Sequence, residues 1–192
     1  ENIQLDRIFI LATFNNAVTD QLKKLAAECG VPVNKVPIEK LNSFNTGEHN
    51  GCVAMLSEIK YSNLQDLISF SFENSLLPLF LMLDGITDIR NIGAIARSAY
   101  AMGVTALIIP EKGVGALNED AIFTSAGALE HLPVCRVNSL MKAVDELHLN
   151  GIKVYATEMT AQKNIFEVDF KDPCAIVMGG EEQGIYPALL KI

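Results

Sequence analysis

The stretch LFLMLDGITDIRNIGAIARSAYAMG, residues 79–103, changes from a run of apolar residues to a segment rich in small ones. Its first five residues are all apolar, as in a strand that is covered on both faces of a sheet. Polar Asp84 and Gly85 end that strand, and the small residues that follow predict a helix. In an α/β sheet, ligands collect where the carboxyl end of a strand faces a helix N-terminus, because free backbone N–H groups point there. The polar residues of this stretch, above all Arg97, are therefore candidates for chemistry.

Seven residues of this stretch fit the pattern D-x-x-x-D-x-x-N-x-G-x-x-x-R-S-A, which begins at Asp84. The pattern resembles the first motif of the SpoU family of RNA 2′-O-ribose methyltransferases. That family usually has proline after the second aspartate, and this chain has Ile89, so no proline ring presets the turn. The alternative is an ordinary helix that Asp88 or Asn91 caps, with Arg97 solvated on its surface.

A second apolar run, residues 174–178, leads into the segment GGEEQGI at residues 179–185. The spacing G-x-E-x-x-G after a buried strand resembles the second SpoU motif, although Glu182 stands where the family often has glycine. A plain strand, turn and helix would explain the glycines but not a glutamate at that spacing. The third motif of the family, an S-L-N segment, is not in the sequence and is expected beyond Ile192.

The resemblance implies a fold, a reaction and a set of site residues. The fold would be α/β, with a C-terminal parallel-sheet SPOUT domain that the third motif completes as a deep trefoil knot. The reaction would move a methyl group from S-adenosylmethionine to a ribose 2′-hydroxyl of structured RNA. The implied catalytic residues are Arg97, Asn91 and Glu181. The implied cofactor-binding residues are Thr157, Gly179, Gly180, Gly184 and Ile185.

Each catalytic residue has an expected role. A guanidinium is effectively never deprotonated in proteins, so Arg97 is expected to bind the adjacent phosphate and stabilise the developing alkoxide. Asn91 would orient the ribose or phosphate, and Glu181 would hold Asn91 or Arg97 in place. In the family the arginine of one subunit approaches the cofactor of the other, and the small residues of 94–101 suit close packing, so a homodimer is expected.

The first part of the chain predicts a small α/β module, residues 1–61, that alternates strands and helices. It resembles the small substrate-binding domain that precedes the catalytic domain in many SpoU proteins, with HNGCVA at 49–54 as a local signature. Residues 62–75 are expected as a linking helix with the domain boundary at its polar end, followed by a methyltransferase domain over 76–192. The elements expected in the small module are strands at 7–11, 31–36 and 52–56 and helices at 18–29 and 38–44.

Between the two motifs the chain also alternates strands and helices, as a parallel sheet requires. The expected strands are 106–109, 134–137 and 152–156, and the expected helices are 119–132 and 140–149.

The charge and the motifs of the sequence bear on which other functions are possible. The net charge of −8 opposes broad phosphate binding, so RNA contact has to be local. The resemblance of the small first module to a substrate-binding domain favours ribosomal RNA over transfer RNA, which stays an alternative. A non-catalytic RNA-binding module would not need the carboxylate, arginine and glutamate set. An NAD enzyme would need a G-x-G-x-x-G fingerprint, which the sequence lacks.

The four cysteines are widely spaced, with no C-x-x-C pair and no histidine at ligand spacing, so neither a metal site nor a disulfide framework is expected. Reduced, mostly buried thiols are predicted instead. No apolar stretch reaches the length of about 20 residues that a membrane span needs. A cytoplasmic protein is therefore expected, and the resemblance to the SpoU family implies RNA as its partner.

Overall fold

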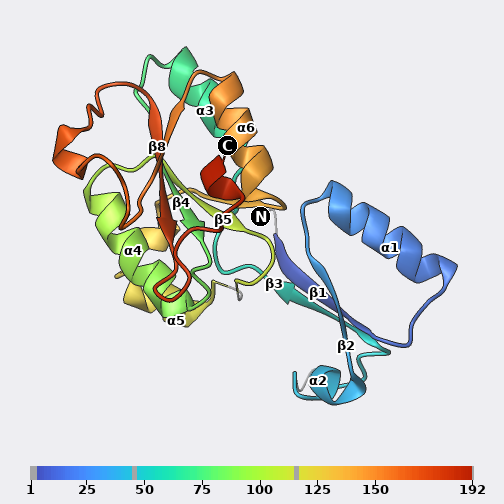
Figure 1. The fold of residues 1–192 in the computed structure, drawn as a ribbon. Coiled ribbons are helices and arrows are strands. Elements are labelled where there is room, and N and C mark those ends of the chain that lie inside the picture. The colour runs from blue at the N-terminus through green and yellow to red at the C-terminus, as the bar shows by residue number, and fades with distance from the viewer. Residues whose placement is uncertain (1–3, 45–46, 115–116, 192) are drawn as a thin grey trace. The chain divides into compact units, whose positions relative to one another are not determined.

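The chain folds into two compact units, which meet in the sequence between Glu58 and Ile59. The computed structural model describes residues 4–44, 47–114 and 117–191 (Figure 1). The division falls before the predicted linking helix, α3 (Leu64–Glu73), and not after it. The physical reason is that α3 is amphipathic and buries Leu64 and Ile68 in the core of the second unit.

The first unit is a three-stranded sheet with two helices, in the predicted order. Strand β1 lies in the middle, parallel to β2 and antiparallel to β3. Asn16 starts the first helix, because its side chain accepts a hydrogen bond from the Thr19 N–H at 2.9 Å. Gly30 ends the helix in the left-handed region, with φ of 65°. The elements of this unit are β1 (Leu5–Leu11), α1 (Ala17–Glu28), β2 (Val33–Val36), α2 (Ile38–Asn42) and β3 (Cys52–Leu56).

Alternating side chains of β1 fill two small cores, one on each face of this sheet. Ile8 and Ile10 pack with Ala26 of α1. Phe9 points to the other face and packs with Leu41 of α2. The central strand is therefore covered on both faces.

The second unit is built on a five-stranded sheet in which every strand runs parallel, in the order β6-β5-β4-β8-β7. This confirms the predicted α/β class with a parallel sheet. The trefoil knot stays a prediction. The elements after α3 are β4 (Leu79–Asp84), α4 (Ile89–Ala101), β5 (Ala106–Pro110), α5 (Glu119–Thr124), η1 (Ala128–Glu130), β6 (Val134–Val137), α6 (Leu140–Leu149), β7 (Lys153–Ala156), η2 (Ile165–Glu167), β8 (Cys174–Gly179) and η3 (Leu189–Lys191).

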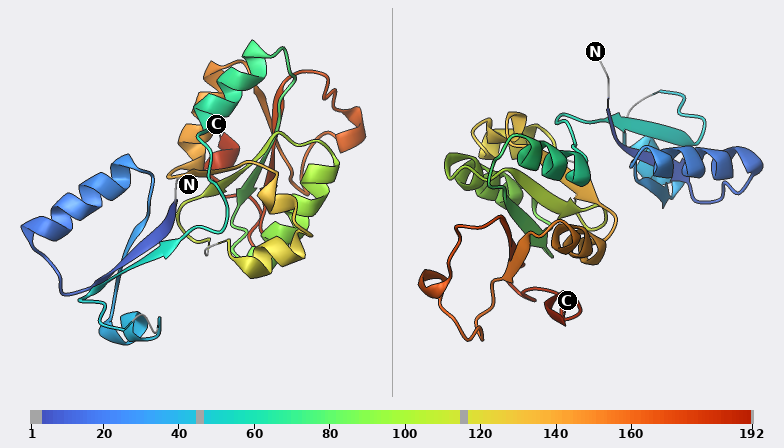
Figure 2. Two further views of the ribbon diagram at one scale, coloured as in Figure 1. Left: turned by 180° about the vertical axis from the view of Figure 1, so that it is seen from behind. Right: turned by 90° about the horizontal axis from the view of Figure 1, so that it is seen from above.

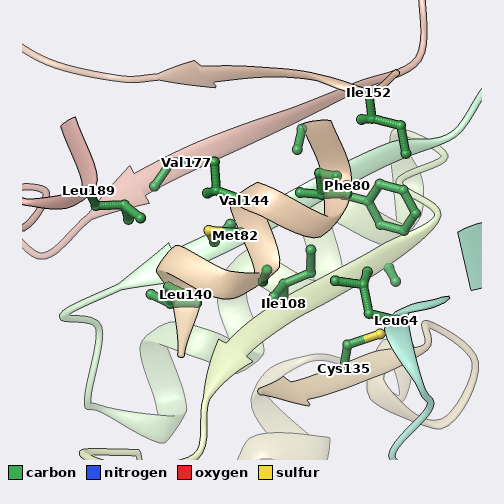
Figure 3. Packing of buried hydrophobic residues seen from close by; sticks show 14 of the residues in the cluster. Leu64, Phe80, Met82, Ile108, Cys135, Leu140, Val144, Ile152, Val177 and Leu189 are labelled. Atoms are coloured by element: carbon green, nitrogen blue, oxygen red, sulfur yellow. The ribbon is translucent and has the colours of Figure 1, made fainter. Parts of the chain in front are cut away.

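Helices cover both faces of this sheet, and Figure 2 shows the resulting layers within the unit. Helices α3 and α6 pack on one face, and α4 and α5 pack on the other. On the first face, Phe80 and Met82 of β4 are fully buried beneath α6 (Figure 3). Burying such a side chain contributes about 1.5–3 kcal/mol, so the two anchor β4 firmly at the centre of the sheet.

The helix predicted over residues 119–132 is wrong in its length. Helix α5 ends at Thr124, and a separate 3-10 turn, η1, follows. The interruption lies at Ala126 and Gly127, whose φ angles of 51° and 81° are left-handed and cannot continue a right-handed helix. The Ser125 hydroxyl oxygen then accepts the Leu129 N–H at 3.2 Å and holds the turn.

The thiols are only partly as predicted. All four are free, but Cys29 and Cys52 are exposed, whereas Cys135 and Cys174 are buried. Burial, with a smaller contribution from the charge of Glu146, raises the pKa of Cys135 to about 12, so that thiol stays protonated and unreactive near neutral pH.

Along the described part of the chain, no helix combines the length and the apolar character that crossing a membrane demands. Over the same residues, no three histidine, cysteine, aspartate or glutamate side chains gather closely enough to hold a metal ion.

Candidate functional site

A cleft of about 910 Å³ lies at the carboxyl ends of β4 and β8. These strands are neighbours, with Asp84 opposite Gly179 at their last paired position. The chain leaves β4 toward β5 on one side and returns much later to place β8 on the other side, so the cleft lies where the strand order reverses. Ligands of open α/β sheets bind at such a point. The volume is within the range of about 300–1,000 Å³ that is typical of ligand pockets.

One wall of the cleft is the start of helix α4. Asp88 caps this helix, because its Oδ1 accepts the Arg90 N–H at 2.8 Å. Asn91, Ala94 and Ile95 line the cleft, at the i, i+3 and i+4 spacing that places side chains on one face of a helix. The side chain of Asn91 is exposed and has no hydrogen-bond partner among the described residues.

Gly93 lies on the side of α4 that packs against α5. A Cβ atom there would lie 2.6 Å from the Ala121 carbonyl oxygen, so only glycine allows α4 to pack this closely against α5. The glycine of the first motif is therefore explained by packing between two helices.

The opposite wall is the glycine-rich loop after β8, which folds back on itself. The Gly184 N–H donates to the Gly180 carbonyl oxygen at 2.9 Å. A Cβ atom on Gly179 would lie 2.2 Å from the Gly184 carbonyl carbon, and one on Gly180 would lie 2.7 Å from the Gly85 carbonyl oxygen. Gly179 requires glycine because its own loop folds back onto it, and Gly180 requires glycine because the backbone after β4 touches it.

A single side chain ties the two walls together. The Tyr186 N–H donates to Oδ2 of Asp84 at 2.6 Å, across 102 positions of sequence. Asp84 ends β4, and Tyr186 follows the glycine-rich loop, so this bond fixes the loop against the strand that begins the other wall. Sequence reasoning gave neither residue a role, although Asp84 stands first in the first motif.

Of the three predicted catalytic residues, the structure brings two together. Asn91 and Glu181 both line the cleft, one from each wall. Arg97 does not line it. Arg97 lies six residues after Asn91 on α4, on the same side of the helix as Arg90. Its side chain is exposed and has no hydrogen bond or ion pair within the described residues.

The predicted cofactor-binding residues are also divided. Gly179, Gly180 and Gly184 line the cleft, and Thr157 and Ile185 do not. The Thr157 hydroxyl donates to the Val177 carbonyl oxygen at 2.9 Å, which joins the end of β7 to β8. The Ile185 side chain is 5% exposed and packs in the core under α6, so only its backbone can face a ligand.

The cleft is acidic. Of the described residues that line it, none is lysine or arginine. A phosphate inside it would therefore meet several carboxylates and no cation from the same chain, which is unfavourable by Coulomb's law. The carboxylates that line it belong to Asp84, Asp88, Glu181 and Glu182.

Comparison with known families finds two matches that together cover nearly the whole chain. The profile described as the SpoU rRNA methylase family matches residues 78–192. The profile described as RNA 2′-O ribose methyltransferase substrate binding matches residues 1–62.

Similar proteins are found in several bacteria. A Bacillus subtilis protein named as a TrmH family tRNA/rRNA methyltransferase is 34% identical over 189 residues, which is 96% of this chain and 76% of the relative. A tRNA/rRNA methyltransferase of Synechocystis is 32% identical over 184 residues, covering 95% of this chain and 48% of the relative.

The solved structures that resemble this fold include two methyltransferases that contain AdoMet. The SpoU methyltransferase AviRb from Streptomyces viridochromogenes, in complex with the cofactor AdoMet, has a TM-score of 0.60 at 21% identity, covering 99% of this chain and 71% of its own. An AdoMet-bound rRNA methyltransferase from Sinorhizobium meliloti has a TM-score of 0.60 at 21% identity, over 99% of this chain and 69% of its own. At these identities the likeness establishes the fold.

Proposed function

This chain belongs to the SpoU rRNA methylase family and is an RNA methyltransferase that uses S-adenosylmethionine, and from that premise we propose that it methylates a ribose 2′-hydroxyl of ribosomal RNA. The match of residues 1–62 to a substrate-binding domain of RNA 2′-O ribose methyltransferases supports the position of the methyl group. The same domain supports a structured RNA such as 23S rRNA as the substrate. Transfer RNA is the alternative.

The observation that carries the proposal is the cleft itself. It brings Asn91 of the first motif and Glu181 of the second to one site, although the two residues are far apart in the sequence. A helix that is merely capped, with no catalytic role, would not require the second motif to end at the same cleft.

The residues present fit the cofactor. Gly179, Gly180 and Gly184 line one side of the cleft, and Gly184 has open space where a side chain would lie, so the backbone there can approach a ligand closely. We propose that this wall holds the cofactor, with the backbone of Ile185 and the nearby end of β7 at Thr157 contributing at its edge. When bound, S-adenosylmethionine supplies an electrophilic methyl group on its sulfonium sulfur.

The chain has to position a weak nucleophile and stabilise charge on it. A ribose hydroxyl reacts slowly at neutral pH, so orientation and electrostatic stabilisation supply the rate. Asn91 can donate and accept hydrogen bonds, which suits it to orient the ribose. Glu181 would hold Asn91 or the catalytic arginine in place. The guanidinium of Arg97 would bind the adjacent phosphate and stabilise the developing alkoxide, and the proton would pass to phosphate or water.

The acidic cleft implies that this guanidinium comes from a second copy of the chain. Arg97 does not line the cleft of its own chain, and the described lining residues include no cation. We therefore propose a homodimer in which Arg97 of each subunit serves the cleft of the other. The exposed small residues Ala94, Ser98 and Ala101 on α4 would allow the close approach that this requires.

Light scattering is expected to show a dimer at micromolar concentration. A closed two-fold pair is the commonest homo-oligomer, and here the site would be incomplete without it. If the protein were a monomer under the conditions in which it methylates RNA, the shared site would be contradicted.

Calorimetric titration is expected to show that the protein binds S-adenosylmethionine at one site per subunit. The control is Asp145→Asn, because Asp145 is exposed on α6 and does not line the cleft. The control should bind the cofactor as the wild type does. If the wild type bound none, the cofactor assignment would be wrong.

A further inference from the structure

The ring of Tyr186 is an uncovered aromatic surface at the edge of the cleft. The residue lines the cleft and is 66% exposed. Within the described residues, neither its ring nor its hydroxyl contacts another ring or makes a hydrogen bond. An aromatic side chain that lines a cleft and is mostly exposed is available to a ligand.

The backbone beneath this ring is held on both sides. The Tyr186 N–H donates to Oδ2 of Asp84 at 2.6 Å. The preceding residue, Ile185, is 5% exposed and anchored in the core, and Pro187 follows with its fixed φ angle. A ring on a backbone that is already ordered loses little further conformational entropy when it binds a ligand.

We infer that Tyr186 is a stacking surface for a nucleobase of the RNA substrate and that Asp84 is the residue that positions it. The inference rests on the proposed function, because it assumes that RNA enters this cleft. It adds a binding role that neither motif assigns to these residues.

The charge of the cleft favours a base over other parts of RNA. Four carboxylates line the site and oppose any phosphate other than the one that Arg97 of the partner subunit would bind, so the uncharged base and sugar are the parts of RNA that the cleft favours. Every base has a flat face that can stack on an aromatic ring, and proteins that bind unpaired RNA use such rings. Stacking therefore supplies affinity that the acidic cleft cannot obtain from cations of its own chain.

The first test compares RNA affinity across substitutions of Tyr186. Tyr186→Ala is expected to weaken binding of a short mixed-sequence RNA by about 5- to 100-fold, whereas Tyr186→Phe keeps the ring and should bind within about twofold of the wild type. Affinity for S-adenosylmethionine should not change in either variant. Equal RNA affinity for wild type and Tyr186→Ala would overturn the inference.

The second test reads the stacking directly by fluorescence. The chain contains no tryptophan, so Tyr186→Trp introduces a single indole at the site. We expect the RNA oligonucleotide to quench its emission and an abasic oligonucleotide of the same length to leave it unchanged, because the abasic strand keeps the phosphates but has no bases. The matched control is Phe70→Trp, an exposed position on α3 away from the cleft, which should not be quenched.

The other outcomes are also decisive. Quenching by S-adenosylmethionine alone would assign the ring to the cofactor and overturn the inference. Equal quenching by the abasic strand would exclude base stacking. The positioning role of Asp84 is tested by hydrogen exchange. Asp84→Ala should speed amide exchange at Tyr186 more than at core amides, and Asp84→Asn, which keeps an acceptor oxygen, should protect the Tyr186 amide as the wild type does. Equal changes in exchange across the whole protein would exclude a positioning role.

These results separate the inference from the proposed function. A wild-type protein that methylates RNA, combined with a Tyr186→Ala variant of unchanged RNA affinity, would refute the stacking role alone. A wild-type protein that transfers no methyl group to RNA would refute the proposed function.

Discussion

Replacing Arg97 by lysine is expected to lower the rate of methyl transfer by about 10²–10³ while cofactor affinity stays the same. Lysine keeps the positive charge, but its ammonium cannot offer the planar fork that matches two phosphate oxygens. The measurement is incorporation of labelled methyl groups into ribosomal RNA, with calorimetry of the cofactor beside it.

Arg90→Lys is the matched control. Arg90 lies seven residues before Arg97 on the same side of α4, is also exposed, and makes an ion pair with Asp88 at 3.7 Å. The Arg90→Lys variant should retain most of the methyl-transfer activity. If Arg97→Lys remained fully active while Asn91→Ala and Glu181→Ala were also tolerated, the catalytic assignment would fail, and α4 would be an ordinary capped helix.

Mixed dimers test whether Arg97 acts across the subunit boundary. Co-expression of Arg97→Lys chains with Asn91→Ala chains should restore about a quarter of the wild-type activity, because half of randomly paired dimers are mixed and each has one intact site. If both residues served the cleft of their own chain, every site in the mixture would be defective and no activity would return.

Gly179→Ala is expected to have the second large effect. Its Cβ would lie 2.2 Å from the Gly184 carbonyl carbon and 2.4 Å from the Ile185 nitrogen, so the loop has to move. Overpacking of this kind typically costs about 1–3 kcal/mol of the free energy of unfolding. We expect affinity for S-adenosylmethionine to fall by about 10- to 100-fold, measured by calorimetry.

The control for this substitution is Gly151→Ala. Gly151 follows α6, has a φ of 74° and no neighbouring atom within 4 Å of an added Cβ, so alanine there would strain the backbone without touching the cleft. It should lower the free energy of unfolding, measured by denaturant titration, and leave cofactor affinity unchanged. Equal loss of affinity in both variants would show that reduced stability, and not the loop, explains the effect.

The main elements of the fold could be predicted because the two decisive strands are continuous apolar runs that end abruptly. Asp84 marks the end of one and the glycine pair 179–180 the end of the other, and these signals are local. The pairing of β4 with β8 is a long-range contact, and the pattern alone does not specify it.

The interruption of the helix predicted over 119–132 was not visible in the pattern. Alanine is a strong helix former, so Ala126 gives no sequence signal for the left-handed φ of 51° that it adopts before Gly127. The tertiary packing of α5 and η1 against α4 overrides the local preference.

The candidate site was predictable in its backbone and less so in its side chains. A motif gives the positions of residues but not their contacts, so it could not indicate that Arg97 is outside the cleft or that the Ile185 side chain is in the core. The hydrogen bond between Asp84 and Tyr186 joins residues of both motif regions, and it becomes apparent only when the two walls are seen together.

The most direct test is to identify the methylated nucleoside. Ribosomal RNA made without modifications would be incubated with the protein and S-adenosylmethionine, digested to nucleosides and analysed by mass spectrometry. The proposed function predicts a nucleoside methylated on its ribose, formed about 10²–10³ times more slowly when Arg97→Lys replaces the wild type. A methyl group found on a base, or methylation of transfer RNA alone, would contradict it.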